Sequence, residues 1–166
     1  MGVFPILLKV NMKVHLWAMG APSDAWVAQG ESLFKKRIDR YLPFEYKNIQ
    51  PSKSSQRIQV MSEEASWLLQ QFDATSSKVI LLDERGPQLS SIQFANRLET
   101  WRQGSHKRVL FIIGSAYGFD PKVSSRADEL LGLSAMTFPH QLCRLMVLEQ
   151  IYRACTILRG ESYHHA

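Results

Sequence analysis

The sequence is poor in cysteine and has no long apolar run, and each absence narrows the class of protein. Only two of its 166 residues are cysteines, Cys143 and Cys155. On one helix they would lie about 18 Å apart, too far for a disulfide, so we expect two reduced core residues in a cytoplasmic protein. Because no apolar stretch reaches the ~18 residues that a membrane span needs, we expect no contact with a membrane.

Two common nucleotide-binding signatures are also missing. The chain contains no Gly-x-Gly-x-x-Gly motif, and no Walker lysine follows its glycine pairs. Nicotinamide and ATP chemistry are therefore disfavoured. No internal repeat or low-complexity tract occurs, and we expect no metal site.

Size and charge favour one compact basic domain. Lys and Arg total 20 against 15 Asp and Glu, for a formal charge of +5, and 45% of the residues are hydrophobic. Such a balance suits a phosphate-rich partner, although an ordinary basic surface explains it equally well. We expect a single domain over residues 12–166, with residues 1–11 as an N-terminal extension, because Met12 could be the true start.

The hydrophobic pattern alternates between strand-like and helix-like segments. Apolar residues recur at helical spacing after Pro22, from Ile58 to Phe72 and from Ile92 to Trp101. This alternation predicts an α/β fold, an α/β/α sandwich with a parallel-rich sheet whose strands are joined by crossover helices. The predicted strands are Val14 to Met19, Phe44 to Ile49, Val79 to Leu82, Val109 to Ile113 and Leu130 to Ser134.

Three turns at predicted strand ends are the places to search for a ligand site. In open α/β sheets, ligands bind where loops leave the carboxyl ends of the strands. These turns are Asp83 to Gly86, Gly114 to Phe119 and Ser134 to Gln141. The pair Gly114 and Gly118 permits close approach of the backbone, but that spacing alone is structurally ordinary.

A long apolar segment follows Pro139 and predicts a helix that is buried nearly all round. Glu149, Gln150 and Arg153 form one polar stripe on it. Two interpretations stay open: an i,i+4 ion pair between Glu149 and Arg153 on a solvated edge, or an Arg153 that faces substrate.

The stretch from Leu133 to His165 resembles the C-terminal region of the RlmH family of SPOUT methyltransferases. The matching residues, in order and at matching spacing, are Leu133-Ser134-x-Met136-Thr137-Phe138-Pro139-His140-Gln141, Arg144, Glu149-Gln150-x-Tyr152-Arg153-Ala154 and Gly160-Glu161-x-Tyr163-His164-His165. The resemblance extends over roughly residues 12 to 165. One departure is Ser115, followed by Ala116, where the family usually has Gly and then often Pro. We expect Ser115 to be tolerated if its φ is negative.

The resemblance implies a fold, a cofactor and a reaction. It implies a C-terminal deep trefoil knot, a homodimer, and S-adenosyl-L-methionine as the methyl donor. The implied reaction methylates N3 of a pseudouridine in large-subunit (23S) rRNA, on free rRNA or on the ribosome. The implied cofactor-binding residues are Leu82, Gly114, Leu133, Ser134, Ala135, Met136, Thr137 and Phe138.

Arg153 and His164 are the candidate catalytic residues. Arg153 could stabilise the negative charge that develops on N3, and His164 could accept the proton. His140 could have a functional role, or it could only pack or form a hydrogen bond with the backbone. The basic segment Lys35 to Arg40 could contact RNA phosphates, or it could be the solvated face of a helix. Two other functions stay open: a methyltransferase that acts on tRNA, and a ribosome-binding protein without catalysis. The candidate RNA-binding residues are His140, Arg144, Tyr163 and His165.

Overall fold

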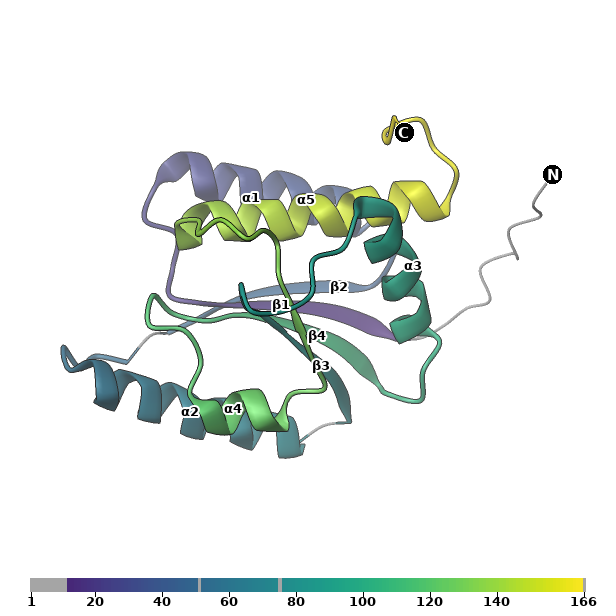
Figure 1. Cartoon of the computed structure of the whole chain (residues 1–166). Coiled ribbons are helices and arrows are strands. Elements are labelled where there is room, and N and C mark those ends of the chain that lie inside the picture. Colours follow the sequence, from purple (N-terminus) through teal and green to yellow (C-terminus); the bar gives the residue numbers. More distant parts are fainter. Residues whose placement is uncertain (1–11, 51, 75, 166) are drawn as a thin grey trace.

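The computed structural model describes residues 12–50, 52–74 and 76–165. They form an α/β/α sandwich around a five-stranded sheet, so the predicted fold class is confirmed (Figure 1). The expected N-terminal extension, residues 1–11, lies outside the described residues. Every neighbouring pair of strands is parallel, and the spatial order is β2-β1-β4-β3-β5. The strands are β1 (Lys13–Met19), β2 (Phe44–Ile49), β3 (Ser77–Leu82), β4 (Arg108–Ile113) and β5 (Glu129–Leu131).

Helices cover both faces of the sheet and create two apolar cores. α1 (Ala25–Ile38), α3 (Ser91–Arg102) and α5 (His140–Leu158) lie on one face, and α2 (Arg57–Ala74) and α4 (Pro121–Arg126) lie on the other (Figure 1). Because side chains alternate along a strand, β4 supplies Phe111 to one core and Leu110 to the other. Within the described residues, no helix is both long and apolar enough to cross a membrane.

Two details of the last third differ from the sequence-based prediction. β5 ends at Leu131 rather than Ser134, because its neighbour β3 ends at Leu82, the partner of Leu131, and the nitrogen of Gly132 donates instead to the carbonyl of Pro87. The short helix α4 was not predicted. It buries only Val123, and so shows no apolar period, although Asp120 and Pro121 form a clear helix start.

The expectation that α5 is buried nearly all round is wrong for the single chain. Val147, Leu148 and Ile151 are buried against the sheet, but Leu142 is 39% exposed and Leu145 is half-buried. The reason is geometric: α5 lies in an outer layer, where the sheet covers one face and α1 and α3 flank it. Its outer apolar face is left open.

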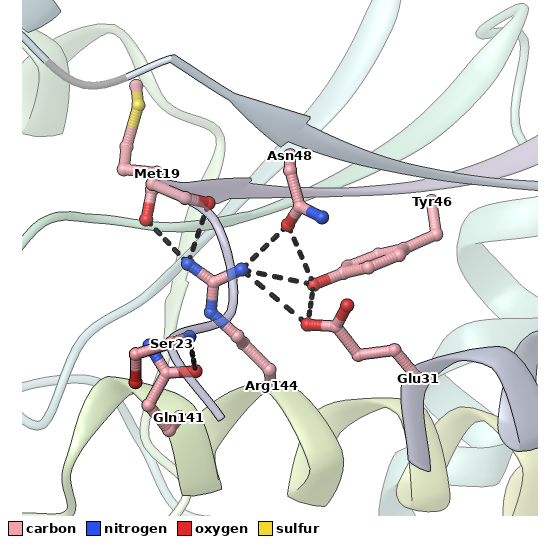
Figure 2. A network of polar contacts seen from close by, with 8 residues as sticks. Met19, Ser23, Glu31, Tyr46, Asn48, Gln141 and Arg144 are labelled. Carbon is pink, nitrogen blue, oxygen red and sulfur yellow. Dashed lines mark hydrogen bonds and ion pairs between the residues drawn. The ribbon is translucent and has the colours of Figure 1, made fainter. Parts of the chain in front are cut away.

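The side chain of Arg144 joins α5 to the carboxyl ends of β1 and β2 (Figure 2). It is 1% exposed. Its Nη2 donates to the carbonyl oxygens of Met19 and Gly20, at 2.7 and 2.8 Å, and its Nη1 donates to Asn48 Oδ1 at 2.6 Å. Glu31 on α1 supplies the counter-charge at 3.5 Å. The expected contact of Arg144 with RNA is therefore corrected, because this guanidinium is enclosed and bonded inside the fold.

A tyrosine completes the polar cluster around Arg144. The hydroxyl of Tyr46 donates to Glu31 and also lies 3.3 Å from Arg144 Nη1. Burial and the Glu31 carboxylate raise the pKa of Tyr46, so its hydroxyl stays protonated and remains a donor. The buried charge pair of Arg144 and Glu31, with its hydrogen bonds, therefore connects α5 to α1, to β2 and to the turn at the end of β1.

Removing Arg144 should destabilise the protein strongly. Arg144→Ala leaves Glu31 and two main-chain carbonyls without their partner, so we expect the free energy of unfolding to fall by about 3 kcal/mol or more. Lys35→Ala is the matched control, because its ion pair with Asp39 is exposed, and it should cost less than about 1 kcal/mol. Urea unfolding at one protein concentration measures both. An Arg144→Ala protein as stable as the control would contradict this role.

Candidate active site

Three loops meet around a cavity at the carboxyl edge of the sheet. The sheet order places β4, β3 and β5 side by side, so the loops that follow them are neighbours in space. The cavity has a volume of about 590 Å³, within the usual range for small-molecule sites. Of the eight expected cofactor-binding residues, all but Ala135 lie in its wall: Leu82, Gly114, Leu133, Ser134, Met136, Thr137 and Phe138.

Direct contacts hold two of these loops together. The hydroxyl of Thr137 donates to Glu84 Oε2 at 3.1 Å. Behind this contact the backbones of Gly86 and Gly132 approach so closely that a Cβ on Gly86 would lie 2.6 Å from the nitrogen of Leu131. Only glycine fits at such a crossing, which fixes the two loops relative to each other.

The third loop is a tight turn after β4. The nitrogen of Gly118 donates to the carbonyl of Ser115 at 3.0 Å, and Gly118 has a φ of +74°. No described residue other than glycine has a positive φ, so Ser115 meets the condition for replacing the family's glycine. The ring of Phe119 lies beneath Gly114, 3.1 Å from where a Cβ would stand. A larger residue at position 114 would push this turn toward the cavity.

Charged and titratable groups border the cavity on two sides. Arg85 donates to both carboxylate oxygens of Asp83, at 2.8 and 2.6 Å, and this lowers the pKa of Asp83. Burial lowers the pKa of His140, and the charge of Arg144 acts in the same direction, so the ring is neutral near pH 7. An interaction with the backbone of Gly114 opposes that shift. His140 thus lies in the cavity wall beside backbone, as its structural interpretation requires.

Helix α2 contributes wall residues that the sequence did not reveal. Arg57 and Met61 line the cavity, together with Tyr117 from the turn after β4. The Arg57 guanidinium lies 5.9 Å from the centre of the Tyr117 ring. Helical periodicity located α2, but it could not show which end of the sheet the helix reaches.

The two candidate catalytic residues contact each other at the far end of α5. Arg153 Nη2 donates to Glu149 Oε1 at 2.6 Å, and Arg153 Nη1 lies 3.2 Å from His164 Nδ1. The hydroxyl of Tyr163 donates to the same Glu149 oxygen at 3.1 Å. The i,i+4 ion pair of the structural interpretation therefore exists, and it also gathers the C-terminal tail, whose residue His165 is exposed.

This geometry constrains the chemistry of His164. The guanidinium can only donate, so Nδ1 must act as the acceptor and the neutral ring carries its proton on Nε2. In that state neither ring nitrogen has a free lone pair. His164 must release Arg153 before it can accept a proton.

Arg153 and His164 lie outside the wall of the three-loop cavity. A second cavity, of about 550 Å³, shares Leu82 and Leu133 with the first and is bordered by Glu149 and Gln150. Glu149 thus lies between this second cavity and Arg153. Within the described residues, no group of three or more His, Cys, Asp or Glu side chains could hold a metal ion.

Comparison with known proteins identifies the family. The profile of a family described as "Predicted SPOUT methyltransferase" matches residues 12–164. The chain is 40% identical to ribosomal RNA large subunit methyltransferase H of Cytophaga hutchinsonii, over 93% of this chain and all of that protein. The chain belongs to the RlmH family of SPOUT methyltransferases. The protein of the same name from Trichlorobacter lovleyi is 42% identical, again over 93% of this chain and all of that one.

Solved structures support the same fold at lower similarity. A probable methylase family protein from Haemophilus influenzae superposes with a TM-score of 0.53 at 12% identity, covering 94% of this chain and 71% of that one. An identity this low shows the fold alone. This SPOUT methyltransferase therefore shares its α/β architecture with a protein that has little sequence similarity to it.

The crossing at Gly86 should control how well the three-loop cavity binds a ligand such as S-adenosyl-L-methionine. In Gly86→Ala the new methyl group meets backbone atoms that cannot move aside, so we expect the affinity for S-adenosyl-L-methionine to fall roughly tenfold or more, about 1.4 kcal/mol. Gly30→Ala is the matched control, because its methyl group meets only the flexible end of Leu145. Calorimetric titration measures both. Equal affinities would show that the crossing does not shape the cavity.

Proposed function

We propose that this chain uses S-adenosyl-L-methionine to methylate N3 of a pseudouridine in large-subunit (23S) rRNA, on the assembled ribosome in the cytoplasm. The observation that carries the proposal is the three-loop cavity, which lies where the family motif predicts it. The relatives that match end to end are named ribosomal RNA large subunit methyltransferase H, which supports the rRNA substrate.

The cavity suits an adenosyl ligand in size and in chemistry. Its wall combines apolar side chains such as Leu82, Leu133 and Phe138 with backbone at Gly114. This mixture serves a flat heterocycle with polar edges. Met136 is 71% exposed at the cavity and is free to cover a bound ligand. The trefoil knot that the family implies remains a prediction.

The residues of the chain must position the target base and manage its proton. The cofactor supplies an already activated sulfonium methyl group, so an N–CH3 bond forms at N3 while the S–CH3 bond breaks and the N3 proton leaves. Arg153 is charged at any relevant pH and stabilises the anion that N3 becomes. Glu149 holds Arg153 in place through two hydrogen bonds. His164 accepts the proton once it has separated from Arg153.

A homodimer would bring the two halves of the site together. In one chain, Arg153 and His164 lie outside the cofactor cavity, so a second copy can supply them across an interface. Exposed apolar side chains on the outer layer support such an interface: Trp26 and Leu33 on α1, and Leu142 on α5, are each more than a third exposed. α1 and α5 lie side by side on the same face of the sheet (Figure 1).

Basic and aromatic side chains near the tail provide a surface for RNA. Arg37 stacks on Tyr152 at 5.4 Å, and Tyr152 meets Tyr163 at 4.8 Å between ring centres. Aromatic rings that stack on unpaired bases, beside arginines that meet phosphates, are the usual basis of recognition of single-stranded RNA. The same cavity would serve a tRNA methyltransferase equally well, and only the substrate separates the two functions.

The direct test is methylation of ribosomes from a strain that lacks this gene. With S-adenosyl-L-methionine, the purified protein should add one methyl group, 14 Da, to one pseudouridine of 23S rRNA, as mapped by mass spectrometry of nuclease fragments. Total tRNA from the same strain is the parallel substrate. Methylation of tRNA alone would favour the second function, and cofactor binding without methylation of either would favour a ribosome-binding protein without catalysis.

Arg153 should matter for turnover and not for cofactor binding. Arg153→Ala removes the charge that stabilises the N3 anion, so we expect turnover at saturating cofactor to fall by roughly 100-fold or more, about 2.7 kcal/mol, with an unchanged Kd for the cofactor. Arg97→Ala, on the exposed side of α3, is the control and should turn over normally. A wild-type rate for Arg153→Ala would remove this residue from the mechanism.

A further inference from the structure

A buried carboxyl group lies beneath the turn that follows β4. Glu64, on α2, is only 8% exposed. Its Oε1 is fully enclosed and has no hydrogen-bond partner among the described residues. The neighbouring Glu63 differs in exposure and in hydrogen bonding. It is exposed, and its carboxylate accepts hydrogen bonds from Ser52 and Gln59. An enclosed carboxyl group without a donor is costly, so Glu64 calls for a functional explanation.

The position of Glu64 connects it to the cofactor cavity. It lines a small cavity, of about 10 Å³, together with Met61, Gly114, Gly118 and Phe119. These four residues also form part of the wall of the cofactor cavity. The small cavity therefore adjoins the larger one at the Gly114 to Gly118 turn.

A second polar atom without a partner lies at the same place. Ser115 Oγ is enclosed, and it too lacks a hydrogen-bond partner among the described residues. Burial raises the pKa of Glu64, and the neighbouring Ser115 hydroxyl partly opposes the shift without completing a hydrogen bond of good geometry. These two enclosed oxygens lie together beside one ligand cavity, and neither makes a well-formed hydrogen bond, which indicates a donor group that arrives with the ligand.

We propose that Glu64, assisted by Ser115, binds a hydrogen-bond donor of S-adenosyl-L-methionine from below the Gly114 to Gly118 turn. This inference rests on the proposed function, because it concerns the same cofactor. The cofactor offers donors that suit a carboxylate in two places: the adenine amino group and ribose hydroxyls of its adenosine half, and the α-ammonium group. A carboxylate that gains such a partner recovers the cost of its burial, so the contact favours the bound state. Glu64 is thus a cofactor-binding residue outside the three loops.

The test compares two ligands on three forms of the full-length protein. S-adenosyl-L-homocysteine carries both donor groups, whereas 5′-methylthioadenosine retains the ribose and lacks the ammonium group. Calorimetry with the unchanged protein, Glu64→Gln and Glu63→Gln gives six dissociation constants. We expect Glu64→Gln to weaken S-adenosyl-L-homocysteine roughly tenfold or more, about 1.4 kcal/mol, and Glu63→Gln to change it less than about twofold. Loss for both ligands assigns the adenosine half, and loss for S-adenosyl-L-homocysteine alone assigns the ammonium group.

Thermal unfolding without ligand separates binding from a structural role. The amide in Glu64→Gln has nearly the same shape and avoids burying an ionisable group, so the Tm of the free protein should equal or exceed that of the unchanged protein. A fall of more than about 4 °C would assign Glu64 to the structure of α2 and overturn the proposal.

Two negative results have different meanings. If Glu64→Gln binds both ligands as tightly as the unchanged protein does, the role of Glu64 is refuted and the proposed function stands. If the unchanged protein binds neither ligand, the proposed cofactor is refuted and the role of Glu64 fails with it.

Discussion

The buried guanidinium of Arg144 is the interaction on which the candidate site depends. Its partners are the main-chain carbonyl of Met19 at the end of β1, the Asn48 side chain of β2 and the Glu31 carboxylate of α1. This one side chain therefore fixes α5 against three other elements. An enclosed ion pair is tolerated only when its geometry is good and its hydrogen bonds are made, which gives α5 little freedom to slide or rotate. Because α5 begins at His140, directly after the loop of residues 133–138, Arg144 also sets where that loop meets the turn at Gly114.

The sheet was largely predictable from sequence, because buried parallel strands are short, unbroken apolar runs. Phe44 to Ile49 was predicted with the bounds it has, and the β4 strand was predicted to within one residue. The end of β5 was not, because a glycine that packs on a distant backbone looks like any other glycine in the sequence. The role of Arg144 was hidden for a related reason: its main acceptors are carbonyl oxygens, which every residue has, so no pattern of residue types marks them.

The positions of the site residues were predicted where a strand end determines them, and missed where a helix contributes from outside the motif. The loops after Leu82, Ile113 and Leu131 converge because the sheet order makes their strands neighbours, and parallel strands end at the same edge. Arg57, Met61 and Glu64 belong to a helix on the opposite layer, whose approach depends on packing alone. The separation of the cavity from the Arg153 group is likewise a property of the folded chain, since the loop of residues 133–138 and Arg153 lie within one continuous stretch of the motif.

The sequence distance across the Arg144 contact has a consequence for how the protein is made. Arg144 bonds to Met19 across 125 positions, and Gln141 meets Ser23 across 118. Contacts between residues so far apart in the sequence form late in folding, because ordering the chain between them costs conformational entropy. During synthesis the contacts between β1 and α5 cannot form until α5 has left the ribosome. A nascent chain therefore has no formed ligand pocket before that point. A product cut short before that helix would be inert rather than partly active.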